Sequence, residues 1–96
     1  MDSDAIRDNA ERHRFEVVVD GHLARADYVI DDDVITFTHT IVPRALEGRG
    51  IASRLILHAL TAARDRGLRV IAQCPFVAAY IRKHPEWADL LAQPLD

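Results

Sequence analysis

Glu47-Gly48-Arg49-Gly50-Ile51-Ala52 joins a strand-like run that ends near Val42 to an apolar run with helical spacing. A helix that begins after a glycine loop presents backbone N–H groups that have no partner within the helix, and its dipole attracts negative charge. The segment therefore predicts a strand, a loop and a helix, with an anion site where the helix starts. Apolar residues repeat along the helix every three or four positions, as expected for one face packed on a sheet; they are Ala52, Leu55, Ile56, Ala59, Leu60 and Ala63.

Two well-known phosphate loops do not match this segment. A Walker loop requires Gly-Lys-Ser/Thr, whereas Ile51 and Ala52 follow Gly50 here. A dinucleotide loop has a third glycine, where this chain has Ser53, and an acidic residue near the end of the next strand, where it has Gln73-Cys74. The loop is thus predicted to bind another kind of phosphate-bearing ligand, although arginines near it are equally compatible with a solvated helix face.

Before the loop, the pattern predicts three antiparallel strands. Residues 15–19 and 22–30 are rich in β-branched and alternating apolar residues, and the dipeptide Asp20-Gly21 between them is typical of a hairpin turn. Residues 34–42 form the third strand after three aspartates, which we interpret as a turn because calcium-loop spacing is absent. Residues 1–12 lack apolar periodicity, so we expect a flexible lead followed by one domain over residues 13–96.

After the loop, the helix is expected to stop at Gly67, since glycine favours the left-handed cap conformation. A fourth strand follows over residues 69–74, then a helix over residues 76–84 between two prolines, and a last turn over residues 86–91. The expected fold is α+β: a mixed sheet of about four strands with one βαβ crossover, right-handed by the usual rule, and C-terminal helices.

Charge and composition restrict the partners. Residues 1–42 carry ten acids and four arginines, while residues 43–69 carry six arginines and two acids. The net charge of -3 argues against nucleic acid as the main partner, and no apolar run approaches the roughly 18 residues of a membrane helix. The N-terminus does not look like a secretory signal, so we expect a cytoplasmic protein, monomeric or weakly homodimeric.

The loop resembles the pyrophosphate motif Gln/Arg-x-x-Gly-x-Gly/Ala of the GNAT (GCN5-related N-acetyltransferase) family. A second block is similar to the C-terminal part of the short, single-domain members of that family, and the resemblance covers residues 15–91. This block reads Cys74-Pro75-Phe76-Val77-Ala78-Ala79-Tyr80-Ile81-Arg82-Lys83-His84-Pro85-Glu86.

The resemblance implies that acetyl-CoA, or coenzyme A, is the cofactor. Its pyrophosphate would lie on the loop amides, its pantetheine between the strand ending near Val42 and the strand ending at Cys74, and the amine acceptor on the opposite side. The implied cofactor-binding residues are Val42, Glu47, Gly48, Arg49, Gly50, Ile51, Ala52, Ser53 and Arg54.

Three departures from the family pattern bear on activity. Glu47 stands where relatives usually have Gln or Arg, which places a like charge near phosphate. Ile41 stands where relatives often have a glutamate base, and the pair of helices that larger members insert after the first strand is missing.

Three residues are candidates for catalysis. Cys74 would lie near the thioester, where it either accepts the acyl group or simply packs as a small buried residue. Tyr80 either protonates the leaving thiolate or packs in the core. His39 is the preferred base because a histidine titrates near neutral pH, although it and Thr40 cannot both face the site on a regular strand. The other histidines show no metal-ligand spacing, so we expect no metal site.

The primary hypothesis is an N-acetyltransferase that passes an acetyl group from acetyl-CoA to an amine, on a small molecule or a protein lysine. The alternative is a non-catalytic module that binds CoA or acyl-CoA as a sensor or adaptor. A third hypothesis is a small protein-interaction domain whose loop binds phosphate incidentally.

Overall fold

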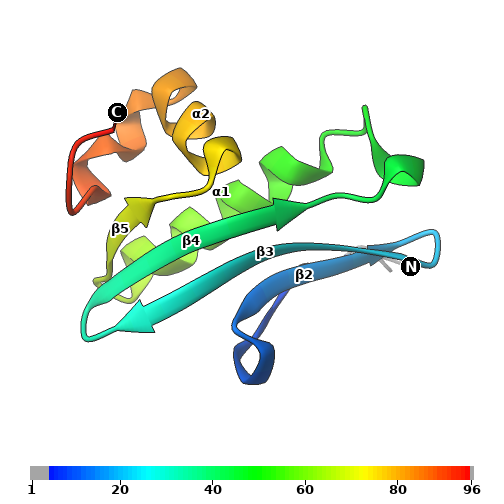
Figure 1. Cartoon of the computed structure of the whole chain (residues 1–96), viewed down its shortest axis with the longest axis horizontal. Coiled ribbons are helices and arrows are strands. Elements are labelled where there is room, and N and C mark those ends of the chain that lie inside the picture. The colour runs from blue at the N-terminus through cyan, green and yellow to red at the C-terminus, as the bar shows by residue number, and fades with distance from the viewer. Residues whose placement is uncertain (1–4, 96) are drawn as a thin grey trace.

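Five strands form one mixed sheet, and a long helix crosses one of its faces (Figure 1). The computed structural model describes residues 5–95. The sheet order is β1-β2-β3-β4-β5, with antiparallel neighbours except for the parallel pair β4 and β5. The strands are β1 (Arg7–Asn9), β2 (Arg14–Val19), β3 (His22–Asp31), β4 (Val34–Ile41) and β5 (Arg69–Ala72); the helices are α1 (Ile51–Asp65) and α2 (Pro75–Lys83), with 3-10 helices η1 (Ala10–Arg12), η2 (Arg44–Leu46) and η3 (Pro85–Leu90).

The α+β class is confirmed, with five strands where about four were expected. The additional strand, β1, lies within the segment predicted to be a flexible lead. It pairs with β2 and is held by polar contacts, among them the hydrogen bond that the Tyr28 hydroxyl donates to Asp8. Such contacts leave no apolar periodicity in the sequence, which explains why the pattern did not reveal this strand. Within residues 5–95, no helix is both long and apolar enough to cross a membrane.

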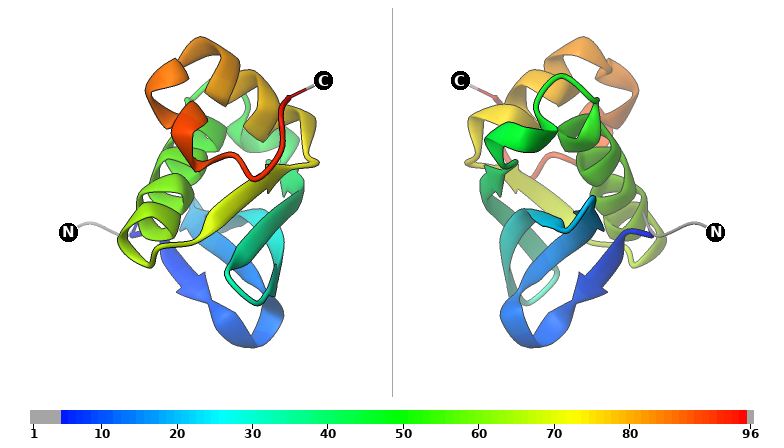
Figure 2. Two further views of the ribbon diagram at one scale, coloured as in Figure 1. Left: turned by 90° about the vertical axis from the view of Figure 1, so that its left-hand side faces the viewer. Right: turned by 90° about the vertical axis from the view of Figure 1, so that its right-hand side faces the viewer.

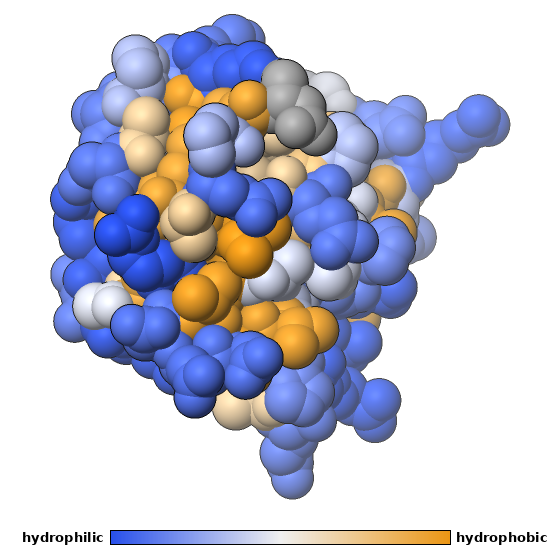
Figure 3. Space-filling view, turned by 60° about the vertical axis from the view of Figure 1, so that its left-hand side comes forward, coloured by the Kyte–Doolittle hydropathy of each residue, from blue (hydrophilic) through white to orange (hydrophobic). Residues whose placement is uncertain are grey.

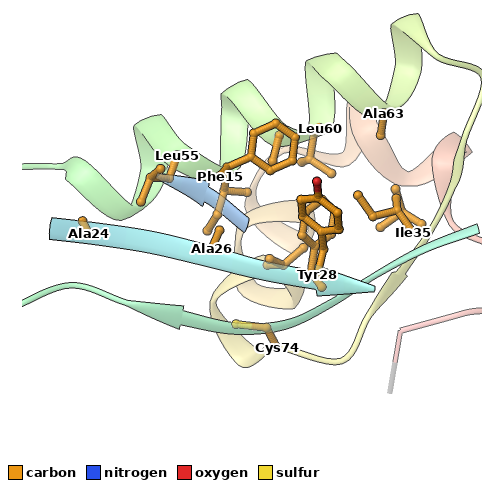
Figure 4. Packing of buried hydrophobic residues seen from close by; sticks show 14 of the residues in the cluster. Phe15, Ala24, Ala26, Tyr28, Ile35, Leu55, Leu60, Ala63 and Cys74 are labelled. Carbon is orange, nitrogen blue, oxygen red and sulfur yellow. The ribbon is translucent and has the colours of Figure 1, made fainter. Parts of the chain in front are cut away.

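The core lies between α1 and the inner face of the sheet. Leu55, Leu60 and Ala63 of α1 face Phe15 and Ile35 of the strands, as the close view shows (Figure 4). The side views show α1 on one face of the sheet and α2 at one end of the molecule, beyond β5 (Figure 2). The helical stripe read from the sequence is therefore the face that packs on the sheet; its buried members are Leu55, Ile56, Ala59, Leu60 and Ala63.

A bulge in β4 changes which side chains face the core. Tyr28 pairs with Phe37, and the preceding residue Asp27 pairs with His39, so Thr38 is an additional residue on β4. Because side chains alternate between faces, one extra residue reverses the alternation beyond it. Thr40 is consequently buried and His39 is exposed.

The far edge of β5 is covered by the C-terminal segment. Leu91 forms a parallel bridge with Val70, and the Ala92 amide donates to the Val70 carbonyl at 2.8 Å. This pairing covers part of the edge of β5, where backbone groups would otherwise be unpaired. The space-filling view, which brings this side forward, shows apolar residues gathered in a band with hydrophilic residues around it (Figure 3).

Candidate functional site

The parallel strands β4 and β5 diverge toward their C-terminal ends. Their pairing stops at Phe37 and Ala72, and the last contact is the Cys74 amide donating to the Phe37 carbonyl at 2.8 Å. Beyond it, β5 gives way to α2 while β4 continues to Ile41. Within the described part of the chain, the end of β4 therefore has a strand neighbour on the β3 side alone, which leaves backbone groups available to a ligand on the other side.

The loop before α1 takes the shape that its glycines allow. Gly48 and Gly50 have φ angles of 80° and 73°, in the left-handed region that side chains disfavour. The Gly50 carbonyl accepts the Arg54 amide at 3.1 Å, which is the first bond of the helix. The amides of residues 51–53 precede that bond and have no partner within the helix, and they lie where the sequence predicted an anion site.

A pocket of about 400 Å³ lies where the end of β4 meets this loop. The pocket is mostly apolar. Its backbone N–H groups come from the glycine loop and from the first residues of α1. The pocket also touches the first turn of α2 through Phe76, which is 55% exposed. Its lining residues are Thr40, Ile41, Val42, Leu46, Glu47, Gly48, Gly50, Ile51, Ala52, Ser53 and Phe76.

A second hollow of about 200 Å³ continues the pocket between α1 and α2. The two share three lining residues, Ala52, Ser53 and Phe76. The second hollow adds Ile56, Ala79, Tyr80, Lys83 and His84. Together they make a groove that runs from the end of β4, past the start of α1, to the basic C-terminal end of α2.

Seven of the nine predicted cofactor residues line the pocket, and two do not. The Arg49 guanidinium pairs with Asp20 at 2.8 Å, which ties the loop to the turn between β2 and β3. Arg54 lines a separate hollow on the outer side of α1, together with Leu57 and His58. The seven that line the pocket are Val42, Glu47, Gly48, Gly50, Ile51, Ala52 and Ser53.

Cys74 lies directly behind the pocket wall. It is 1% exposed, and its Sγ lies 3.2 Å from the Thr40 Oγ1, which belongs to the pocket lining. Thr40 therefore stands between the thiol and the pocket, and acyl transfer to Cys74 would require Thr40 or the ligand to shift.

Tyr80 lies on α2 in the second hollow, partly buried and stacked on the His84 ring with centroids 4.3 Å apart. Burial raises the pKa of its phenol above the ordinary value, and the nearby Glu86 carboxylate raises it further. The phenol is thus protonated at neutral pH and can donate a proton.

His39 is placed on the sheet face opposite α1, outside the pocket lining. The bulge at Thr38 causes this, because it turns Thr40 toward the pocket and His39 away from the core. The structure thus separates the three proposed catalytic residues: one is buried behind the pocket, one lies along the groove, and one is on the outer face.

Sequence reasoning missed part of the groove wall. Leu46, Phe76, Lys83 and His84 line it. Helical spacing could have revealed the residues of α2, because positions 76, 80 and 83 fall on one side of a helix and Tyr80 was already a candidate. Leu46 gave no such signal, since it lies in η2, a short turn within the loop.

Comparison with known proteins agrees with this geometry. The sequence profile of the family described as GCN5-related N-acetyl-transferase matches residues 14–90. Protein NATD1 of the mouse, Mus musculus, is 30% identical over 84 residues, which cover 83% of this chain and 76% of that protein. A GCN5-like protein from Staphylococcus aureus, solved by NMR, superposes with a TM-score of 0.76 at 26% identity, covering 100% of this chain and 94% of that one. The chain belongs to the GCN5-related N-acetyltransferase family.

Proposed function

We propose that this protein transfers an acetyl group from acetyl-CoA to an amine. One observation supports the proposal most strongly: a single groove contains both the N-terminus of α1 and the end of β4. The amides at the start of α1 can bind an anion, and the end of β4 has no neighbouring strand on one side. CoA needs both features: amides for its pyrophosphate and strand-like backbone partners for its pantetheine amides. Membership of the family supports the same chemistry.

The groove suggests how the cofactor lies. The pyrophosphate binds the amides of residues 51–53, and the pantetheine follows the apolar wall of Val42, Leu46 and Phe76 toward Thr40. The adenosine end extends along the second hollow, where the Lys83 ammonium attracts phosphate. Glu47 also lines the pocket, so its carboxylate weakens binding of the anionic cofactor.

Transfer proceeds by direct attack in this proposal. The amine nitrogen forms a bond to the thioester carbonyl carbon as the C–S bond breaks, and the CoA thiolate takes up a proton. Tyr80, the donor predicted from the sequence, lies in the second hollow with the adenosine end, away from a thioester near Thr40. In this pose the proton therefore comes from the attacking amine. A route through acetyl-Cys74 is less favoured because the thiol is buried behind Thr40.

The alternative is a non-catalytic module that binds acyl-CoA. Two features favour it: His39 is outside the pocket, and Ile41 stands where members of the family often carry a glutamate base. It uses the same cofactor groove, so binding alone does not separate the two functions.

Thermal unfolding with acetyl-CoA, ADP or NAD at equal concentration tests the cofactor. Acetyl-CoA at about 100 times its Kd stabilises by roughly 2.7 kcal/mol, which should raise the Tm by on the order of 10 °C. Equal shifts with all three ligands would contradict the proposal. Release of free CoA with a panel of polyamines, lysine peptides and small amines then decides between the two functions: saturable turnover supports the transferase, and its absence with tight binding supports the module.

A further inference from the structure

Two contacts close the gap between the chain segments at the point where β4 and β5 diverge. The Cys74 amide donates to the Phe37 carbonyl at 2.8 Å, which extends the pairing of the two strands by one backbone bond. Further along β4, the Thr40 Oγ1 lies 3.2 Å from the Cys74 Sγ, so a side-chain hydrogen bond spans the gap after the backbones have separated. Because Thr40 lines the cofactor pocket, this pair of side chains forms the pocket wall at the β4 end.

This wall is firm because both of its side chains are buried. Thr40 is 8% exposed and Cys74 is 1% exposed. Cys74 belongs to the core cluster, together with Phe37, Val77 and Ile81, and a protein core is close-packed. The hydroxyl and the thiol satisfy each other, so a ligand that pushed Thr40 aside would break a buried hydrogen bond. An atom that enters from the pocket therefore meets a wall that resists displacement.

The position of this wall relative to the cofactor gives it a use. In the pose proposed above, the pantetheine follows Val42 and Leu46 toward Thr40, which places the thioester near Thr40 and its acyl chain against the wall. An apolar pocket of fixed size discriminates by chain length, since one methylene changes affinity by about 10- to 200-fold. The acyl group is therefore the part of the cofactor that the wall measures.

We propose that Thr40, supported from behind by Cys74, limits the acyl group to acetyl and is the residue that determines acyl specificity. The inference rests on the acetyl-CoA site of the proposed function and adds the class of donor: acetyl-CoA is preferred over propionyl-CoA and butyryl-CoA. It concerns the donor alone, so it applies equally to a transferase and to a module that only binds acyl-CoA.

Titration calorimetry with free CoA, acetyl-CoA, propionyl-CoA and butyryl-CoA, in the absence of an amine, tests the proposal. The unmodified protein should bind propionyl-CoA about tenfold or more weakly than acetyl-CoA, and butyryl-CoA more weakly still. Thr40→Ser keeps the hydroxyl and removes a methyl group, so the affinity for propionyl-CoA relative to acetyl-CoA should rise by about tenfold. Thr40→Val is the matched control: it keeps the size of the side chain and removes the hydroxyl, so this ratio should stay unchanged.

Cys74→Ala provides a second variant that leaves Thr40 in place, and it decides the question if the Thr40 variants do not fold. Removal of the sulfur leaves space behind Thr40, so the relative affinity for propionyl-CoA should rise by about threefold or more. Equal binding of the three thioesters by the unmodified protein, or the same change of ratio in Thr40→Val as in Thr40→Ser, would overturn the proposal. Failure of free CoA and of every thioester to bind would overturn the cofactor site and this inference with it, whereas binding without discrimination overturns the inference alone.

Discussion

At the scale of single residues, two glycines in the loop set the direction of the helix-start amides. Gly50 adopts a φ of 73° as the N-cap of α1, and a Cβ built there would meet no atom within 4 Å. Its requirement for glycine therefore comes from backbone conformation and not from crowding.

Gly50→Ala should cost about 1–2 kcal/mol of unfolding free energy, because an L-residue is strained in this region. It should also weaken acetyl-CoA binding by about tenfold or more, since displaced amides lose hydrogen bonds to a charged phosphate. Gly21→Ala is the matched control: it has a φ of 77° and an equally uncrowded site in the hairpin turn. Denaturation and titration calorimetry should show similar destabilisation in both, with affinity lost in Gly50→Ala alone. Equal affinities would remove the loop from the cofactor site.

At the scale of elements, a buried carboxylate fastens β1 to the sheet. Glu16 of β2 is 7% exposed and accepts hydrogen bonds from Arg7, Asn9 and Arg14. Burial opposes its ionisation, but the hydrogen bonds from Arg14, Arg7 and Asn9 prevail and lower its pKa to about 2, from an ordinary 4.5. The ionised form therefore stabilises the fold.

Because this pKa is lowered on folding, the contribution is complete above about pH 4.5 and is lost as the pH falls toward 2. Glu16→Gln should destabilise the protein by about 1–3 kcal/mol at pH 7, as expected for hydrogen bonds to a charged group. The difference from the unmodified protein should shrink between pH 4.5 and 2, as urea denaturation at a series of pH values would show. Glu11→Gln, at an exposed position, should be neutral throughout. A difference that did not change with pH would contradict the role of the ionised carboxylate.

At the scale of the whole molecule, the packing of α1 on the sheet carries the stability of this small chain. Leu60 is 0% exposed between helix and sheet, whereas Leu57, one turn away, is 45% exposed. A single core of this size leaves a net stability of roughly 5–15 kcal/mol.

Leu60→Ala should therefore remove about 2–5 kcal/mol, a large part of the total, and lower the Tm by about 10 °C or more. Leu57→Ala, the same substitution on the same helix, should stay within about 0.5 kcal/mol. Calorimetry of both variants tests this. Similar losses in the two would mean that α1 does not pack as described.

The sequence by itself determined the features that depend on local patterns. The helical stripe of α1, the Asp20-Gly21 turn and the glycine loop each follow from residue spacing, so the α+β class, the crossover and seven pocket residues could be predicted. Only the tertiary structure decided the rest. β1 is held by polar contacts with distant residues, and the bulge at Thr38 leaves no mark in the sequence yet reverses the faces of His39 and Thr40. Contacts between residues far apart in the chain, such as Thr40 with Cys74 and Arg49 with Asp20, likewise depend on register, which residue spacing alone does not specify.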